Sequence, residues 1–205
     1  VDIAHRALGL VRDVEVAVCG DAKAAAREIL ERLKNLEVTA QTNRDTRLDE
    51  LITQRQAWEA ELTGWSSSDL SPLAPRRALR ELEAAMPADA VVSTDIGNIC
   101  SVANSYLRFD RPNSFLAAMS WGNCGYAMPV AMGAKVGQPD RPAIAYVGDG
   151  AWGMSLTEVM TCVREQIPVV AVVFENQQWG AEQRNQLDFF DGRCVATALE
   201  LSLIH

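Results

Sequence analysis

Histidine is nearly absent from this sequence, and its scarcity restricts the chemistry that the chain can perform. The two histidines, His5 and His205, stand at the extreme ends of the 205 residues. A catalytic histidine or a histidine-based metal site is therefore not expected. The five cysteines form no C-x-x-C pair. This use of cysteine argues against a disulfide framework and is typical of a reduced, cytoplasmic protein.

Basic clusters and long apolar segments are also missing. No run of Lys and Arg occurs, and the formal net charge is -8 with a pI of about 4.8. Such a chain is not suited to nucleic acid or to an anionic membrane surface. The longest apolar run, IPVVAVVF, is far shorter than the ~20 residues that span a bilayer. We therefore expect neither a nucleic-acid partner nor a membrane partner.

The N-terminal third of the sequence predicts one strand and two helices. The alternation in VEVAVCG, residues 14–20, indicates a short strand. Residues 22–34 have the spacing of an amphipathic helix, and Asp21 precedes them as a capping residue. A second helix is predicted from roughly Asn43 to Leu62. The polar segment WSSSDLSP then separates this region from the next one.

From Pro75 onward, helical segments alternate with apolar strands. We predict helices at 75–86, 98–107, 126–137 and 155–166, and strands at 90–95, 114–118, 143–147 and 169–174. This alternation predicts an α/β fold, a parallel sheet with helices on both faces. Ligands of such sheets bind beyond the carboxyl ends of the strands. The polar clusters TDIGN, AMSWGNCG, VGDGAWG and FENQQWG occupy those ends here.

The cluster in AYVGDGAWGMSLTE has more than one interpretation. A glycine turn after a strand can simply reverse the chain. Alternatively, Gly148, Gly150 and Gly153 match the G-x-G-x-x-G of a dinucleotide-binding turn, and Glu175 follows near the position of the ribose-binding acid. Asp149 does not suit that second interpretation, because a carboxylate repels a bare pyrophosphate unless a cation lies between them.

A third interpretation supplies the cation. Asp149 and Asn176 end two strands, and the stretch of chain from one residue to the other has the length of one helix and one strand, so a parallel sheet brings their oxygens to the same edge. A carboxylate, an amide oxygen, a backbone carbonyl and phosphate oxygens suit Mg²⁺. The physical argument favours a metal–diphosphate site over a dinucleotide site and leaves both open.

The same residues resemble a known family. GDG followed by a helix, an apolar strand and Asn resembles the signature of thiamine-diphosphate-dependent enzymes, whose final NN pair is Glu175-Asn176 here. SWGNCGYAMPVAMGAK and STDIGN resemble segments of the acetolactate-synthase-like members. The resemblance implies a thiamine-diphosphate-binding fold. It also implies that residues 1–36 end a central α/β domain, 37–70 form a helical linker and 71–205 form a diphosphate-binding domain that is C-terminally incomplete.

Residue roles follow from this resemblance. It implies that Asp149, Asn176 and the backbone carbonyl of Gln178 ligate Mg²⁺, and that the amides of Gly150 and Ala151 meet the diphosphate of the cofactor. The full set of residues implied to bind thiamine diphosphate is Gly97, Asn98, Ile99, Gly122, Asn123, Cys124, Gly148, Asp149, Gly150, Ala151, Asn176, Gln178, Trp179 and Gly180.

Two further roles are implied for one segment of that set. The carbonyl of Gly122 accepts from the 4'-amino group of the cofactor, and Cys124 takes the place of the apolar wedge that bends it. The glutamate that activates the cofactor in this family is expected outside the present sequence, so we expect the 205-residue chain to be inactive alone.

The substrate is implied by the most particular part of the resemblance. FENQQWGAEQRNQLDFF is similar to the sulfoacetaldehyde acetyltransferase branch of the family. This implies that the full-length protein converts sulfoacetaldehyde and phosphate to acetyl phosphate and sulfite, as a homodimer or homotetramer. An acetolactate-synthase-like or 2-oxo-acid-decarboxylating enzyme is the alternative within the class. A non-catalytic cofactor-binding or assembly domain and an NAD-binding oxidoreductase are the alternatives outside it.

Overall fold

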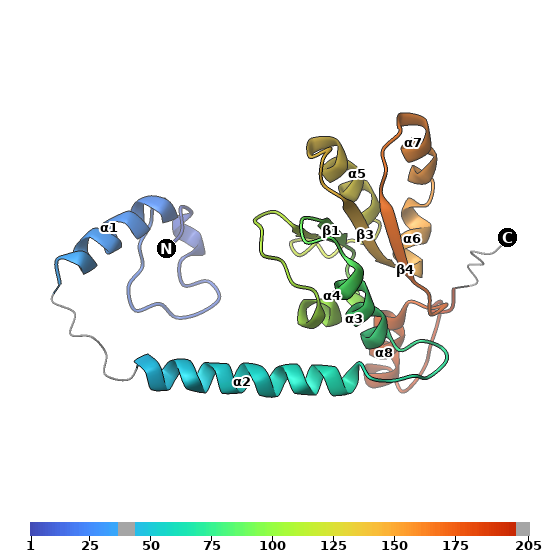
Figure 1. Cartoon of the computed structure of the whole chain (residues 1–205), viewed down its shortest axis with the longest axis horizontal. Coiled ribbons are helices and arrows are strands. Elements are labelled where there is room, and N and C mark those ends of the chain that lie inside the picture. Colours follow the sequence, from blue (N-terminus) through green and yellow to red (C-terminus); the bar gives the residue numbers. More distant parts are fainter. Residues whose placement is uncertain (37–43, 200–205) are drawn as a thin grey trace. The chain divides into compact units, whose positions relative to one another are not determined.

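A computed structural model describes residues 1–36 and 44–199 of the chain (Figure 1). These residues divide into two compact units, Val1–Arg55 and Gln56–His205, and helix α2 (Arg44–Trp65) crosses the boundary between them. Within the described ranges, no helix combines the length and the apolar character that crossing a membrane requires.

The first unit is mostly helical. It contains the short 3-10 helix η1 (His5–Ala7) and helix α1 (Ala22–Lys34). The predicted cap is confirmed, because the Asp21 side chain accepts a hydrogen bond from the amide of Ala24 at 2.8 Å. The strand predicted over residues 14–20 is wrong. Only one bridge forms there, between Asp2 and Cys19, so the alternating residues lack a neighbouring strand with which to build a ladder.

Helix α2 corresponds to the second predicted helix and continues past Leu62 to Trp65. Its expected first residue, Asn43, lies outside the described residues. Leu62 is buried, and its carbonyl accepts a hydrogen bond from the Tyr106 hydroxyl at 3.1 Å. Leu62 and Tyr106 both belong to the second unit, so this contact packs the end of α2 within that unit.

The second unit is built around a four-stranded sheet in the order β2-β1-β3-β4, with every pair of neighbours parallel. The fold class predicted from the sequence is thereby confirmed. The strands are β1 (Val91–Thr94), β2 (Phe115–Ala117), β3 (Ala143–Gly148) and β4 (Val170–Phe174). The helices are α3 (Pro75–Ala85), α4 (Asn98–Tyr106), α5 (Ala127–Gly137), α6 (Asp149–Ser155), α7 (Glu158–Glu165) and α8 (Gly180–Phe189).

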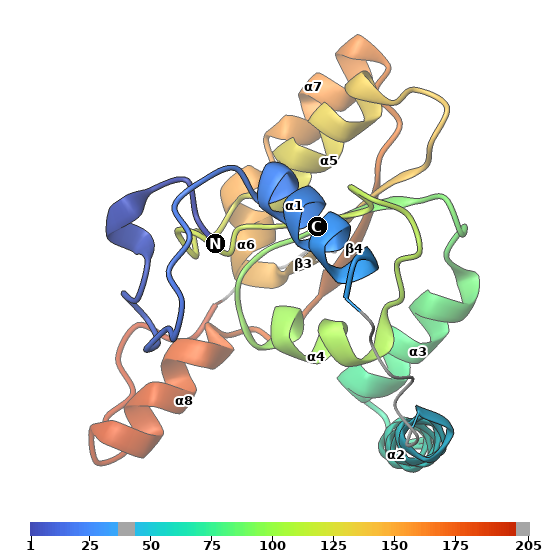
Figure 2. The same ribbon diagram turned by 90° about the vertical axis from the view of Figure 1, so that its left-hand side faces the viewer.

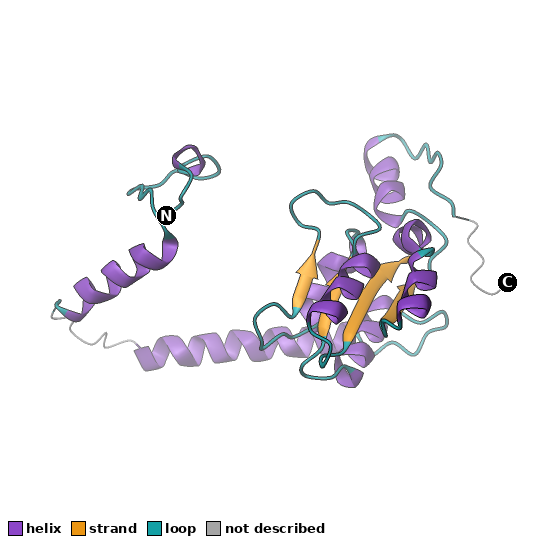
Figure 3. Cartoon of the chain, turned by 90° about the horizontal axis from the view of Figure 1, so that it is seen from above, coloured by secondary structure: helices purple, strands orange, loops and turns teal. Residues whose placement is uncertain are grey.

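Both faces of the sheet are covered by helices (Figures 2 and 3). Alternate residues of β3 point to opposite faces. Ile144 and Tyr146 belong to the cluster that packs against α3 and α4, whereas Ala145 and Val147 belong to the cluster that packs against α5 and α6. Because β3 is apolar on both faces, it was recognisable as a continuous apolar run in the sequence.

Two features differ from the sequence-based expectation. The helix predicted over 155–166 is the shorter α7, and the glycine turn before it, expected as a turn, forms a separate helix, α6. Helix α8 was not expected. Strand β4 forms an edge of the sheet, and its first residue, Val170, is 58% exposed.

One cation holds the amino ends of three strands together. The Arg141 guanidinium donates hydrogen bonds to the carbonyls of Asp89 (2.7 Å) and Ala90 (3.3 Å), which precede β1, and to the Ser114 hydroxyl (2.6 Å), which precedes β2. Arg141 itself stands just before β3 and also donates to Gln138. The positive charge of Arg141 is therefore stabilised by oxygen atoms from the loops that precede β1, β2 and β3.

Truncation of Leu79 tests the packing of α3 on the sheet. Leu79 is fully buried, so Leu79→Ala is expected to lower the free energy of unfolding by about 2–5 kcal/mol. Urea denaturation of both proteins measures this change. Leu70→Ala is the matched control, because Leu70 is 75% exposed and its loss should change the free energy by less than about 0.5 kcal/mol. Equal effects of the two substitutions would contradict the packing described.

Candidate cofactor site

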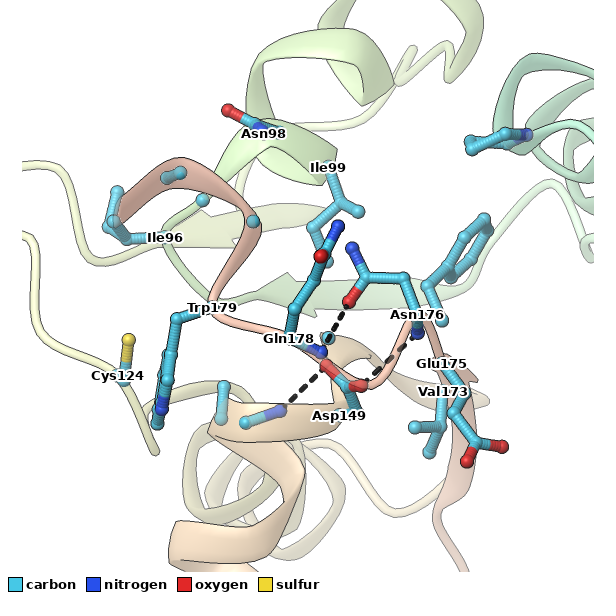
Figure 4. Close-up of a pocket in the computed structure, with 18 of the residues that line it drawn as sticks. Ile96, Asn98, Ile99, Cys124, Asp149, Val173, Glu175, Asn176, Gln178 and Trp179 are labelled. Atoms are coloured by element: carbon cyan, nitrogen blue, oxygen red, sulfur yellow. Dashed lines mark hydrogen bonds between the residues drawn. The ribbon is translucent and has the colours of Figure 1, made fainter. Parts of the chain in front are cut away.

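A pocket of about 440 Å³ lies at the carboxyl ends of the strands. The connection from β1 leads outward to β2, whereas the connection from β3 leads to β4 on the opposite side. Such a change of direction between neighbouring strands opens a crevice at their carboxyl ends, the usual ligand site of this sheet type. Residues that follow β1, β3 and β4 line the pocket (Figure 4).

Asp149 organises the turn between β3 and α6. Its side chain is only 3% exposed and accepts three backbone hydrogen bonds. Oδ1 accepts from the amide of Gly150 at 2.9 Å, and Oδ2 accepts from the amides of Asn176 (3.1 Å) and Gln177 (2.6 Å). The carboxylate thus joins the glycine turn to the segment that follows β4. It also occupies the Gly150 amide that the family resemblance assigns to the diphosphate.

The segment after β4 is held from two sides. Within it, Asn176 Oδ1 accepts a hydrogen bond from the amide of Gln178 at 3.2 Å, as Figure 4 shows. On its outer side, the amide of Trp179 donates to the carbonyl of Thr197 at 2.8 Å, and the amide of Leu199 donates to the carbonyl of Gln177 at 2.8 Å. These bonds fix Gln178 and Trp179 where they line the pocket.

The start of α4 forms another wall of the pocket. Gly97 has φ +133°, a backbone conformation that favours glycine, and it directly precedes Asn98, the first residue of the helix. The Tyr146 hydroxyl donates to the carbonyl of Ile99 at 3.0 Å, which ties this wall to β3. A Cβ added at Gly180 would lie 3.7 Å from Nδ2 of Asn98 and 3.1 Å from Nδ2 of Asn176, so both amide side chains adjoin the first turn of α8.

Only one residue of the segment Gly122–Cys124 lines the pocket. Cys124 lines the pocket, whereas Gly122 and Asn123 do not. Burial raises the pKa of the Cys124 thiol, and the carboxylates of Asp95 and Glu182 raise it further. At neutral pH this thiol is protonated, which suits a small apolar contact better than a nucleophile.

The structure therefore brings most of the predicted residues to one place. All of the predicted cofactor and metal residues except Gly122 and Asn123 line the pocket. The lining also includes Glu175, which the sequence offered only as a ribose-binding acid or as part of the NN pair, and residues that the sequence did not single out: Pro72, Leu73, Pro75, Ala78, Ile96, Val172, Val173, Phe174, Ala181 and Glu182. Glu182 was detectable, because it lies in the continuation of FENQQWG. Pro72 and Leu73 carried no such signal, since they lie between the predicted linker and the first predicted helix of the diphosphate-binding domain.

The oxygen atoms at this edge fit a hard divalent cation. Asp149 supplies a carboxylate, Asn176 an amide oxygen and Gln178 a backbone carbonyl, and all three residues line the same pocket. Within residues 1–36 and 44–199, no group of three or more His, Cys, Asp or Glu side chains could hold a metal. A site here would thus combine one carboxylate with neutral oxygens and phosphate, as Mg²⁺ sites commonly do. The Glu175 carboxylate points away from Asp149 (Figure 4).

Comparisons with known proteins point to one family. The profile described as "Thiamine pyrophosphate enzyme, C-terminal TPP binding domain" matches residues 95–203. The sulfoacetaldehyde acetyltransferase of Castellaniella defragrans is 54% identical over 98% of this chain and 36% of its own length. The acetolactate synthase large subunit of Corynebacterium glutamicum is 30% identical over 97% of this chain and 31% of its own length. The chain therefore spans roughly a third of the curated relatives that it matches.

A solved structure has the same fold. The thiamine diphosphate-dependent 4-hydroxybenzoylformate decarboxylase of Rhodococcus jostii RHA1 matches with a TM-score of 0.57 and 24% sequence identity. The match covers 64% of this chain and 28% of that chain. At this identity the likeness concerns the fold alone.

Substitution of Gly150 tests the contact between the glycine turn and Trp179. A Cβ at Gly150 would lie 2.6–2.9 Å from three atoms of the Trp179 ring, so Gly150→Ala must displace the ring or the turn. We expect a loss of about 1–3 kcal/mol in the free energy of unfolding, the usual cost of overpacking, measured by urea denaturation.

Gly133→Ala is the matched control for this substitution. Gly133 lies within α5, and a Cβ there would meet no atom within 4 Å. Alanine at that position should stabilise the helix by about 0.5–1 kcal/mol. If Gly150→Ala were as well tolerated as Gly133→Ala, the close contact with Trp179 would be refuted.

Proposed function

This chain belongs to the thiamine pyrophosphate enzyme family, and from that membership we propose that the full-length protein transfers an acetyl group from sulfoacetaldehyde to phosphate. The products are acetyl phosphate and sulfite. The observation that carries the proposal is the 54% identity to a sulfoacetaldehyde acetyltransferase over 98% of the chain. Family membership favours the metal–diphosphate interpretation of GDGAWG over the dinucleotide interpretation.

A metal ion anchors the cofactor in this proposal. Asp149, Asn176 and the carbonyl of Gln178 hold Mg²⁺, whose charge offsets that of the diphosphate. The buried Asp149 supports this assignment, because its three hydrogen bonds fix its position relative to the other two ligands. The turn residues Gly148, Gly150 and Ala151 line the same pocket.

Other residues enclose the rest of the cofactor. Gly97, Asn98 and Ile99 flank the diphosphate from the start of α4, and Trp179 and Gly180 line the same pocket at the start of α8. The Gly122 carbonyl and the neighbouring Asn123 contact the aminopyrimidine ring, and Cys124 supports the bent shape of the cofactor. When bound, thiamine diphosphate supplies the carbanion that attacks the aldehyde carbonyl. The residues of this chain hold that cofactor and orient it.

The proposal extends to the organisation of the longer protein. Residues 1–36 end a central domain, 37–70 include a helical linker and 71–205 belong to the diphosphate-binding domain, in which the family match lies. The longer protein is a cytoplasmic homodimer or homotetramer. An acetolactate-synthase-like activity is the second candidate, and it is supported by the 30% identity to such an enzyme over 97% of the chain.

Product analysis of the full-length protein tests the substrate. With sulfoacetaldehyde, phosphate, thiamine diphosphate and Mg²⁺, we expect sulfite and acetyl phosphate to form in equal amounts. Colorimetric assays measure both products. Pyruvate in place of sulfoacetaldehyde is the matched control and should yield little carbon dioxide. A higher specificity constant for pyruvate would support the second candidate and overturn the first.

Calorimetry with thiamine diphosphate tests the metal ligands. In the full-length protein, cofactor binding should require Mg²⁺. Asp149→Ala should weaken cofactor binding by more than about tenfold, because mutation of a residue that merely supports a metal ligand already costs about that much. Asn176→Ala should act similarly. Glu175→Gln is the matched control, because that carboxylate points away from Asp149. Undiminished binding by Asp149→Ala, with or without metal, would rule out the assigned site.

A further inference from the structure

Asp95 stands where β1 meets the pocket. It directly follows the strand, its side chain is fully buried, and its amide donates to the carbonyl of Tyr146 on β3 at 3.3 Å. The next residues, Ile96 and Gly97, line the pocket, whereas Asp95 does not. Because Asp95 is covalently bonded to Ile96, any displacement of Asp95 also displaces this wall of the pocket.

The carboxylate of Asp95 holds a second segment. Oδ1 accepts a hydrogen bond from the amide of Tyr126 at 2.9 Å, and Oδ2 accepts one from the amide of Ala127 at 3.1 Å. These amides form the N-terminus of α5, whose dipole favours a negative charge. In the part of the chain that the structure describes, Asp95 forms no ion pair. Burial raises its pKa, and the amide donors of Tyr126, Ala127 and Gly125 oppose this shift.

The segment that Asp95 holds leads directly to the pocket. Cys124, which lines the pocket, lies two residues before Tyr126 in the sequence. Between them, Gly125 has φ +78°, and a Cβ there would lie 3.2 Å from Cβ of Met154. The segment also adjoins the first wall, because a Cβ at Gly122 would lie 3.8 Å from Cγ1 of Ile96. The backbone at Cys124 thus has little freedom to shift unless the hydrogen bonds to Asp95 change.

We propose that Asp95 is a positioning residue for the cofactor pocket, and that its buried carboxylate sets the spacing between the Ile96–Ile99 wall and Cys124. It is joined to the first wall covalently and to the second through two backbone hydrogen bonds. This inference rests on the proposed function of the pocket. It assigns a role in binding to a residue that neither contacts the pocket nor ligates a metal.

The two oxygens of Asp95 are both needed for this role. Asparagine has nearly the same shape but only one acceptor oxygen, so its NH₂ group would face the amide of Tyr126 or Ala127. A buried donor left without an acceptor costs about 1–3 kcal/mol, which the backbone at residues 125–127 can reduce only by moving. Asp95→Asn therefore changes the spacing of the walls while it preserves the volume of the side chain.

Calorimetric titration of the full-length protein with thiamine diphosphate at fixed Mg²⁺ tests this role. We expect Asp95→Asn to raise the dissociation constant about tenfold, which corresponds to the loss of one hydrogen bond to a charged group. In sulfite-release assays, the apparent KM for the cofactor should rise by the same factor. The turnover number at saturating cofactor should change less than the KM.

Ser93→Ala is the matched control. Ser93 is also fully buried on β1, and its hydroxyl donates to the carbonyl of Ala127, so it joins the same strand to the same helix. We expect both variants to lower the midpoint of thermal unfolding, but only Asp95→Asn to weaken cofactor binding. If the variants weakened binding equally for the same loss of stability, Asp95 would have a purely structural role and the inference would fail.

The remaining outcomes also decide the question. Wild-type affinity in Asp95→Asn would overturn the inference and leave the proposed function intact. A wild-type protein that does not bind thiamine diphosphate would overturn the proposed function, and the inference with it. If Asp95→Asn does not fold, Gly125→Ala replaces it, because that substitution strains the same segment without altering a buried charge. Unchanged cofactor affinity in a folded Gly125→Ala protein would likewise refute the role of the spacing.

Discussion

The pocket depends on one buried carboxylate. Asp149 accepts backbone hydrogen bonds from its own turn and from the segment after β4, and these are the two places that carry the proposed metal ligands. A charge in this position is costly unless donors surround it. The amides that satisfy Asp149 therefore also determine the relative position of the two loops. A metal held by the proposed ligands would meet backbone that is already in place, which would limit the ordering that binding must still provide.

The sheet supplies the conditions for this arrangement. Because all four strands are parallel, their carboxyl ends meet at one edge, and the order β2-β1-β3-β4 sends the two connections in opposite directions. The lining of the pocket consequently comes from separate connections, at the starts of α4, α6 and α8. The Tyr146 hydroxyl ties the start of α4 to β3, and Asp95 ties the end of β1 to the start of α5. The site is thus a product of tertiary structure and not of one continuous motif.

The sequence predicted the parts of this molecule that follow local rules. Strands β1 to β4 were recognisable because each is a short apolar run followed by polar residues. Asp149 and Asn176 could be paired because parallel strands bring their ends together. The strand predicted over residues 14–20 was wrong, because an alternating pattern indicates a strand but does not show whether another strand lies beside it. The approach of Pro72 to the pocket, the use of the Gly150 amide by Asp149 and the position of Asp95 between two walls depend on long-range packing. No local pattern encodes them.

The two ends of the sheet are held by groups of opposite charge. Arg141 collects carbonyl and hydroxyl oxygens at the amino ends of the strands, whereas Asp95 and Asp149 collect amides at the carboxyl ends. The Arg141 contacts include none of the residues that line the pocket. The loops at the carboxyl ends can therefore rearrange while the amino ends stay joined. Arg141 gives the sheet a fixed base, so a rearrangement of the pocket loops would not require the contacts at the amino ends to break.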